Sequence, residues 1–363
     1  MEFVNLTDLC KDFFWIMPQT PKYLEDGEIP YITSKNIKEG IIKFDKYNRI
    51  SYEDYIKISK NREIIENDFL ISMIGTLGEV AIVKKNDLPF YGQNMFLLRL
   101  NDDLVDLRFI YYFLISKDTK SKLLEKQNKA TQSYLRYNDV VSLKVPAYDK
   151  SKQIEIVAEI SNILKLIDFN NKSLINLDNI VKSQFIEMLN KEESENWPQY
   201  SIGELYKFQY GKGNNIPESK GDYPCYGSNG QVGYHTEWNN EDAPIIGHIG
   251  AYAGAVVWAE GKHFVTYNGV MCKLKNKYIL NPKFGYILLC NQNYLEGARN
   301  GAAQPFVSYD TLEKPITKLP PIDLQNKFAD FVQQTDKSKF IVQKQIRLLE
   351  ELLEKKMNEY FGQ

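Results

Sequence analysis

The apolar positions of residues 153–190 recur mostly three, four or seven apart, and the stretch contains neither Gly nor Pro. This spacing predicts one long amphipathic helix that carries its apolar side chains on a single face. At 1.5 Å per residue the helix would be roughly 55 Å long, more than an ordinary globular helix. The stripe consists of Ile156, Ile160, Ile163, Ile167, Leu174, Leu177, Val181 and Met188.

Residues 325–361 repeat this pattern and predict a second long helix. Because one helix cannot bury an apolar stripe against itself, we expect the two helices to pack together as an antiparallel coiled coil. The second stripe consists of Phe328, Val332, Val342, Ile346, Leu349, Leu353, Met357 and Tyr360.

The segments that precede the helices combine short strands with short helices. Apolar and β-branched runs bounded by turn residues predict strands at 29–33, 69–74, 79–84 and 95–100, and again at 243–249, 255–259 and 270–274. Helices are predicted from Ser51, over 107–116 and over 283–293.

The two halves of the chain align with each other at a nearly constant offset. Asn128, Ala130, Gln132, Tyr137 and Gln153 each meet the same residue type 172 positions later, and Ile74-Gly75 meets Ile249-Gly250 at an offset of 175. This shared order predicts an internal duplication. The fold class is α+β, with two mixed α/β domains separated by two long helices and related by a pseudo-two-fold axis. The segments are a first domain at 1–150, a central helix at 151–195, a second domain at 196–320 and a C-terminal helix at 321–363.

Composition narrows the classes of function. The chain has 45 Lys and Arg against 47 Asp and Glu, a net charge of −2, so any nucleic-acid binding must come from locally clustered side chains. No apolar run reaches the roughly 18 residues of a membrane helix, and the first residues lack the pattern of a signal peptide. The four cysteines lie far apart, which indicates reduced thiols and a cytoplasmic protein.

Motifs for catalysis are weak. Asn281-Pro282-Lys283-Phe284 is similar to a methyltransferase loop, but no Gly-rich cofactor loop precedes it, and we expect it to cap a helix. Gly247, Gly250 and Gly254 lack the Lys-Ser/Thr ending of a phosphate-binding loop and predict a strand turn. The three histidines do not have metal-ligand spacing. We therefore expect a non-catalytic chain without a metal or cofactor of its own.

Taken together, these features resemble the specificity subunit of type I restriction–modification systems over essentially the whole chain. The resemblance is carried by the exits Lys144-Val145-Pro146 and Lys318-Leu319-Pro320, by the helix-opening Gln153 and Gln325, and by the Gly75 and Gly250 turns. Gly92-Gln93-Asn94 also has a counterpart in Tyr267-Asn268-Gly269. As a departure from a strict repeat, the second domain is shorter by some 25 residues.

The resemblance implies two target recognition domains, each of which reads half of a bipartite double-stranded DNA target. It implies two partner methyltransferase subunits that bind S-adenosylmethionine and methylate adenine. A restriction subunit that uses ATP and Mg is a further implied partner. Two alternatives stay open: the specificity subunit of another multi-subunit restriction system, and a scaffold protein that does not bind DNA.

Base edges and phosphates are recognised by cationic, amide, hydroxyl and aromatic side chains, which single out two corresponding polar loops at 128–136 and 300–308. The alternative is that their repeated Gln132 and Gln304 bond the backbone of each domain, and that the other candidates are solvated surface residues. The full set of DNA-contact candidates is Lys35, Asn36, Arg62, Asn128, Lys129, Gln132, Ser133, Tyr134, Arg136, Lys212, Asn229, His248, Tyr252, Arg299, Asn300, Gln304 and Ser308.

Overall fold

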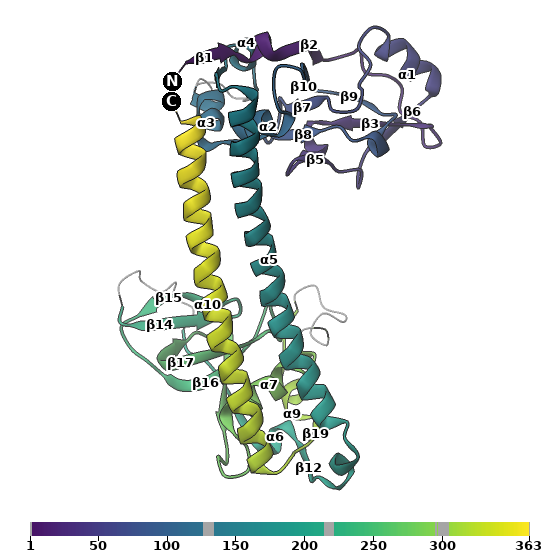
Figure 1. Ribbon diagram of the computed structural model, residues 1–363. Coiled ribbons are helices and arrows are strands. Elements are labelled where there is room, and N and C mark those ends of the chain that lie inside the picture. The colour runs from purple at the N-terminus through teal and green to yellow at the C-terminus, as the bar shows by residue number, and fades with distance from the viewer. Residues whose placement is uncertain (1, 126–133, 214–220, 295, 297–304, 363) are drawn as a thin grey trace. The chain divides into compact units, whose positions relative to one another are not determined.

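Two compact units make up the chain in the computed structural model, which describes residues 2–125, 134–213, 221–294, 296 and 305–362. Unit 1 contains Met1–Asn171 and Lys344–Gln363, and unit 2 contains Lys172–Gln343. The division passes through both long helices, α5 (Lys150–Leu189) and α10 (Ile322–Phe361), each of 40 residues (Figure 1). Each unit therefore combines a mixed domain with half of each helix.

The predicted helices are confirmed, and both begin three residues earlier than the sequence pattern indicated. Within unit 1, Glu159 of α5 forms an ion pair with Lys356 of α10 (3.1 Å) and a hydrogen bond with Tyr360. Within unit 2, Asp178 pairs with Lys339 at 2.5 Å, and the ring of Phe185 lies 5.7 Å from that of Phe328. In unit 1 the Nζ of Lys152 lies 6.0 Å from the ring of Tyr360, whereas the later Glu159 pairs with the earlier Lys356. In unit 2 Asp178 meets Lys339, whereas the later Phe185 meets the earlier Phe328, so the helix halves of each unit pack antiparallel.

Unit 1 buries its apolar side chains mainly around a four-stranded sheet of order β2-β10-β7-β8. In a second sheet, of order β6-β3-β9, β3 runs parallel to β9. Phe361, at the end of α10, contributes to the core of this unit, with its ring 5.2 Å from that of Phe109. The elements of unit 1 are β1 (Phe3–Asn5), β2 (Cys10–Ile16), β3 (Ile29–Thr33), β4 (Ile37–Lys38), β5 (Ile41–Ile42), β6 (Asn48–Ile50), α1 (Tyr52–Ser59), β7 (Phe69–Ser72), β8 (Val80–Ile82), β9 (Tyr91–Gln93), β10 (Met95–Leu100), α2 (Leu107–Ile115), α3 (Lys117–Glu125), α4 (Tyr137–Val141) and β11 (Lys144–Pro146).

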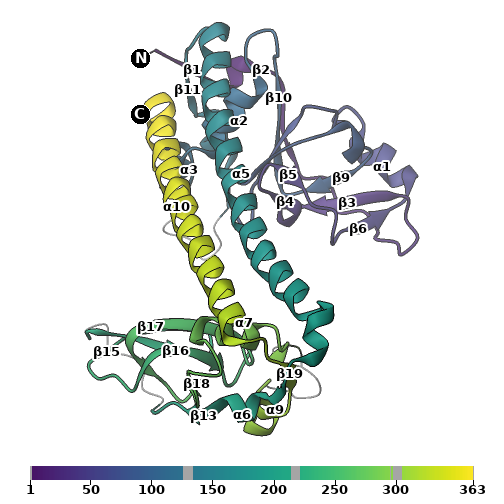
Figure 2. The same cartoon turned by 60° about the horizontal axis from the view of Figure 1, so that its bottom comes forward.

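Unit 2 is built around one six-stranded sheet of order β13-β18-β16-β17-β14-β15 (Figure 2). Its strand β17 is long enough to pair antiparallel with β16 and parallel with β14, whereas unit 1 uses the separate strands β8 and β9 for these pairings. Because one strand makes both pairings, the second domain needs fewer strands than the first. The elements are β12 (Gln199–Ser201), α6 (Ile202–Leu205), β13 (Tyr206–Tyr210), β14 (Tyr223–Gly227), β15 (Gly230–His235), β16 (Asn240–Gly247), β17 (Val256–Val265), β18 (Gly269–Leu274), α7 (Pro282–Cys290), α9 (Tyr309–Glu313) and β19 (Ile316–Lys318).

The helix-opening glutamines have the same buried environment in both units. The side-chain oxygen of Gln153 accepts a hydrogen bond from the backbone N–H of Asp106 (2.8 Å), and its amide donates to the Tyr148 carbonyl (2.8 Å). Gln325 does the same with the Asn281 N–H (2.9 Å) and the Pro320 carbonyl (2.8 Å).

Asp106 and Asn281 are themselves the N-caps of α2 and α7. Each glutamine therefore fastens the start of a long helix to the start of a short helix in its own domain. Because the same contacts recur in both units, the structure supports the duplication that the sequence predicts.

Candidate nucleic-acid interface

One loop junction recurs in both units, beside the glycine turn that follows a central strand. In unit 1, Ile74 forms an isolated antiparallel bridge with Tyr134, and the Leu135 N–H donates to the Met73 carbonyl at 2.9 Å. The hydroxyl of Ser34, directly after β3, donates to the Ile74 carbonyl at 2.8 Å. These bonds bring together three loops that are far apart in the sequence, at 34–36, 73–79 and 134–136.

The corresponding junction of unit 2 shares the bridge and the backbone bond beside it, and its serine bonds a different loop. Ile249 forms an isolated antiparallel bridge with Phe306, and the Val307 N–H donates to the His248 carbonyl at 2.9 Å. The hydroxyl of Ser228, directly after β14, donates to the Asn268 carbonyl at 2.7 Å. The loops gathered here are 211–213, 228–229, 248–255, 266–268 and 305–308.

Glycine gives both junctions an open backbone. Gly75 and Gly250 follow the bridged isoleucines and have φ of 82° and 93°, a region that side chains rarely adopt. Among the residues that the structure describes, none has an atom within 4 Å of a Cβ placed at either position. These residues leave the space above each turn unobstructed, and the glycine is required by the backbone angle.

Lys35 and Asn36 are neighbours with opposite roles. Lys35 is exposed in unit 1's junction, which suits contact with a phosphate. Asn36 is buried, and its amide donates to the carbonyls of Lys43 and Lys46, each at 2.8 Å. Burial and these bonds argue against the predicted DNA contact of Asn36, which stays untested, because its hydrogen-bonding groups hold a loop of the domain.

His248 also belongs to the interior of its domain. Its ring is buried and lies 4.3 Å from the ring of Tyr210 in a tilted arrangement, and its Nδ1 lies 3.2 Å from the Tyr267 carbonyl oxygen. These contacts place the ring beneath the junction loops of unit 2 and argue against the predicted DNA contact, which stays untested.

Three other candidates of unit 2 lie together on the junction. Lys212, Asn229 and Tyr252 are all exposed on its loops. Lys212 is held through its backbone N–H, which donates to the Val265 carbonyl at 3.0 Å, so its side chain projects from an anchored loop. The structure thus gathers three candidates that are separated by tens of residues in the sequence.

Arg136 and Ser308 occupy equivalent positions as the N-caps of α4 and α9. The Ser308 hydroxyl accepts a hydrogen bond from the Thr311 N–H at 3.2 Å, so it caps the helix. At the start of α4 the backbone N–H of Arg136 donates a hydrogen bond to the Asp139 carboxylate at 3.0 Å. The Arg136 side chain takes no part in this bond and is exposed. Of the two, Arg136 is the one whose side chain projects from the junction.

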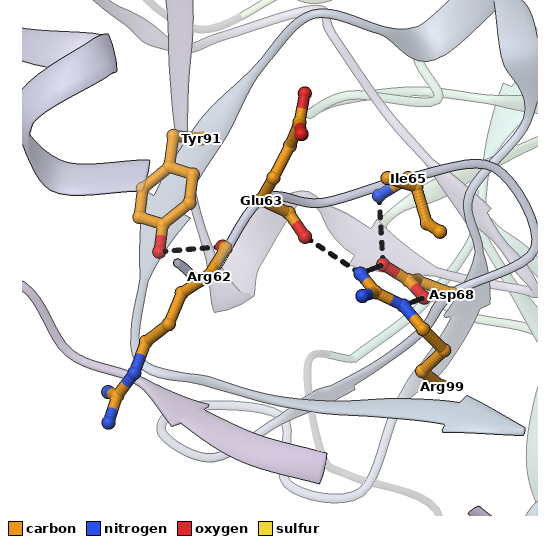
Figure 3. A network of polar contacts seen from close by, with 6 residues as sticks. All are labelled: Arg62, Glu63, Ile65, Asp68, Tyr91 and Arg99. Carbon is orange, nitrogen blue, oxygen red and sulfur yellow. Dashed lines mark hydrogen bonds and ion pairs between the residues drawn. The ribbon is translucent and has the colours of Figure 1, made fainter. Parts of the chain in front are cut away.

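Arg62 lies on a different segment of unit 1, just before β7. Its guanidinium contacts the ring of Phe14 (5.5 Å) and the Trp15 carbonyl (3.4 Å) on β2. Figure 3 shows its side chain pointing away from the neighbouring pair Asp68 and Arg99. Arg62 is therefore exposed, but it reaches β2 and not the three loops of the junction.

The pair beside it holds the segment in place. Both carboxylate oxygens of the buried Asp68 accept hydrogen bonds from Arg99 at 2.8 Å, and one also accepts from the Ile65 N–H at 2.8 Å (Figure 3). Burying this carboxylate is favourable only because it is paired and bonded on several sides.

Several candidates from the sequence lie outside the described residues, so the site described above does not include them. They are Asn128, Lys129, Gln132, Ser133, Arg299, Asn300 and Gln304. Two residues of the junction in unit 2 were missed, namely Tyr267 and Phe306, which are both exposed. The offset of 172 already pairs Phe306 with the candidate Tyr134, so the repeat alone was a sufficient signal for it.

The weak catalytic motifs take structural roles, as expected. The Asn281 side chain accepts hydrogen bonds from the backbone N–H groups of Lys283 (2.9 Å) and Phe284 (3.1 Å), which makes it the N-cap of α7. Burial raises the pKa of the Cys10 thiol to about 12 and that of the fully buried Cys272 thiol well above its ordinary value, so neither is a ready thiolate nucleophile at neutral pH. Within the described part of the chain, no group of three or more His, Cys, Asp and Glu side chains is placed to hold a metal ion.

None of the described helices combines the length and the apolar composition that a membrane span requires. This holds for α5 and α10 despite their 40 residues, because polar side chains cover most of their surface.

Comparison with known proteins gives concordant results. A family model described as the type I restriction modification DNA specificity domain matches residues 1–179 and 194–351. The chain is 25% identical over 342 residues to the type I restriction enzyme EcoprrI specificity subunit of Escherichia coli, covering 87% of this chain and 82% of that protein. It is 24% identical over 362 residues to the putative type I restriction enzyme MjaX specificity subunit of Methanocaldococcus jannaschii, covering 90% and 84%.

Solved structures are similar in fold. The crystal structure of a type I restriction-modification S subunit from M. genitalium superposes with a TM-score of 0.57 at 20% identity, covering 100% of this chain and 96% of that chain. A chain from a structure concerned with complex assembly and conformational transition of the type I R-M system has a TM-score of 0.62 at 13% identity, covering 99% and 97%.

Proposed function

The chain belongs to the family of type I restriction modification DNA specificity domains and is a DNA specificity subunit, and from this premise we propose how it works. Each unit reads one half of a bipartite double-stranded target through its loop junction. The observation that carries this proposal is the recurrence of the same bridged junction, once in each unit.

The junction has the properties that base readout requires. Its loops are fixed by backbone hydrogen bonds, so the exposed side chains project from a rigid base. Lys35 and Arg136 in unit 1, and Lys212 and Asn229 in unit 2, are able to bond phosphates or base edges. The different side chains on a common framework would give the two halves of the target different sequences.

Modification and restriction would be carried out by partner proteins. S-adenosylmethionine would bind to methyltransferase subunits that methylate adenine, two for each specificity subunit, and ATP and Mg would bind to a restriction subunit. This chain would recognise the target sequence and provide the surface on which the partners assemble.

The long helices offer surfaces for such partners. In unit 2, Phe340 and Ile341 of α10 are exposed and line a groove of about 1180 Å³ that Trp258 of β17 also borders. Asp330, Asp336 and Lys337 of α10 also line the groove, so it combines exposed apolar side chains with charged ones, as protein-binding surfaces do. We assign this groove to the binding of a methyltransferase subunit. Phe340→Ala should weaken that binding, and co-purification of the methyltransferase with the variant chain measures the loss.

The direct test is to co-express the chain with the methyltransferase encoded beside its gene and to map methylated adenines in the DNA of the host. The expected result is one new motif with two defined halves and an unspecified gap. A single continuous motif would contradict the assignment of one half-site to each unit. No new methylation, with the complex assembled, would favour a scaffold that does not bind DNA.

A further inference from the structure

An exposed aromatic side chain occupies the bridged position of both junctions. Tyr134 is 45% exposed and Phe306 is 53% exposed, whereas the next residue of each loop, Leu135 or Val307, is fully buried. A single exposed aromatic residue is common on protein surfaces. Its recurrence at one bridged position in two diverged domains, with the aliphatic neighbour inward both times, indicates a role for the outward ring.

The backbone beneath each ring is held from both sides. In unit 1, the bridge to Ile74 is completed by the Leu135 N–H bond to Met73. In unit 2, the loop receives a further bond, from the Gly250 N–H to the Pro305 carbonyl at 2.8 Å. A ring on such a backbone loses little conformational freedom when it binds a ligand, which favours binding by stacking.

The surroundings of Phe306 favour stacking over ionic contact. Lys212 is the one charged residue among the described residues of the loops at this junction (211–213, 228–229, 248–255, 266–268 and 305–308). Tyr252 and Tyr267 are exposed on the same loops, and the open face of Gly250 lies beside them. Flat side chains next to a glycine without steric obstruction can approach a flat ligand closely.

We propose that Tyr134 and Phe306 each stack on a base at the equivalent position of the two half-sites, and so act as paired aromatic contacts on unstacked bases. This inference rests on the proposed function. Aromatic contacts of this kind stabilise a locally opened base step, which an enzyme that modifies a base within a duplex requires. Tyr134 and Phe306 would thus help the partner methyltransferase to reach its adenine, and they would do so without a catalytic role of their own.

Photocrosslinking tests the contact directly. The duplex carries the mapped target, with 5-iodouracil or 5-iodocytosine in place of each pyrimidine in turn, and the complex with the co-expressed methyltransferase is irradiated. The expected adducts join Tyr134 to one half-site and Phe306 to the other, as identified by mass spectrometry of the crosslinked peptides. Adducts to other residues only, at every position, would overturn the proposal.

Affinity measurements give a second readout that separates stacking from other roles. Tyr134→Ala and Phe306→Ala should each weaken binding on the order of tenfold, as loss of one base–aromatic stack predicts. Tyr134→Phe and Phe306→Tyr should retain the affinity, and Tyr134→Leu should not. The slope of log K against log salt should be unchanged, because no phosphate contact is removed.

Matched controls are available in both units. Tyr52 on α1 and Tyr278 before α7 are at least as exposed as the two aromatic residues of the junctions, and Tyr52→Ala and Tyr278→Ala should leave affinity unchanged. Thermal melting of each variant confirms that it is folded. If the wild-type complex methylates a bipartite motif but Tyr134→Ala and Phe306→Ala bind DNA with normal affinity, the stacking proposal is wrong and the proposed function stands. If no bipartite motif is methylated, the proposed function is wrong as well.

Discussion

Lys35 and Asn36 show how strongly neighbouring residues can differ in their effect on binding and stability. Lys35→Ala removes an exposed cation, so it should weaken binding to all DNA sequences alike and reduce the salt slope by about one. Asn36→Ala leaves the carbonyls of Lys43 and Lys46 without their donor and should lower the free energy of unfolding by about 1–3 kcal/mol. Fluorescence anisotropy with labelled duplexes and urea unfolding measure the two effects. A stability loss in Lys35→Ala would contradict the assignment.

The Asp68 and Arg99 pair provides a prediction on stability alone. The Asp68 side chain is 1% exposed, so Asp68→Ala leaves a guanidinium that has lost its partner and should cost about 3 kcal/mol of unfolding free energy. The control is Lys117→Ala, which breaks an ion pair with Glu354 in which both side chains are more than half exposed, and should cost less than about 1 kcal/mol. Equal losses in the two variants would show that burial of the pair is not decisive.

His263 predicts a dependence of stability on pH. Its ring is fully buried, and this burial lowers its pKa below the ordinary value. Below about pH 6.5 the unfolded chain takes up a proton at this position that the folded chain resists, so stability falls as pH falls. His263→Gln should flatten this decline between about pH 6.5 and 5, above the range in which most carboxylates titrate. Urea unfolding at a series of pH values measures the difference, and parallel curves would contradict it.

At the residue scale, the sequence predicts which side-chain types suit DNA contact but not which of those side chains are exposed. Asn36 and His248 have the right chemistry for DNA, but burial decides their role, and burial depends on contacts with distant segments that no local pattern records. Phe306 was missed for the opposite reason, since a ring beside Val307 looks like core until the bridge to Ile249 turns it outward.

At the scale of elements, Gln153 and Gln325 make the same pair of backbone hydrogen bonds in their two units. Gln153→Ala would leave the partly buried Asp106 N–H without its acceptor, and Gln325→Ala would do the same to the Asn281 N–H. Each should cost about 1–3 kcal/mol and loosen only its own unit. Hydrogen exchange measures this as lost protection in α2 for the first variant and in α7 for the second. Gln184→Ala, an exposed position on α5, is the control and should change little.

The long helices and the central strands could be predicted because their periodicity is local. The sheet orders could not, since they depend on pairings such as that of β17 with β14, in which Phe264 meets Cys225 from a distant part of the chain. The sequence placed a strand at 255–259, whereas β17 continues to Val265. The glycine turn after β16 and the capping role of Asn281 were both predicted correctly, because turn and cap chemistry involves only neighbouring residues.

At the scale of the molecule, both long helices contribute to both units, so their length should influence the gap in the DNA target. Four residues inserted in each helix, after Asn171 and after Gln343, add roughly 6 Å of helix, or about one to two base pairs. We expect the mapped motif to gain a longer gap with both half-sites unaltered. Methylome sequencing measures this, and changed half-sites would contradict a spacer role for the helices.

The placement of Phe361 in the core of unit 1 has a consequence for synthesis on the ribosome. Unit 2 is a continuous segment, so all of it has been translated once Gln343 has left the exit tunnel. Unit 1 is made first, but its core stays open until the last turn of α10 emerges and packs on Phe109. The domain translated first is therefore the domain completed last, and in the nascent chain its exposed apolar face is a natural substrate for chaperones. A premature stop codon after Gln343 would remove part of the core of unit 1 and leave the whole of unit 2 in the chain.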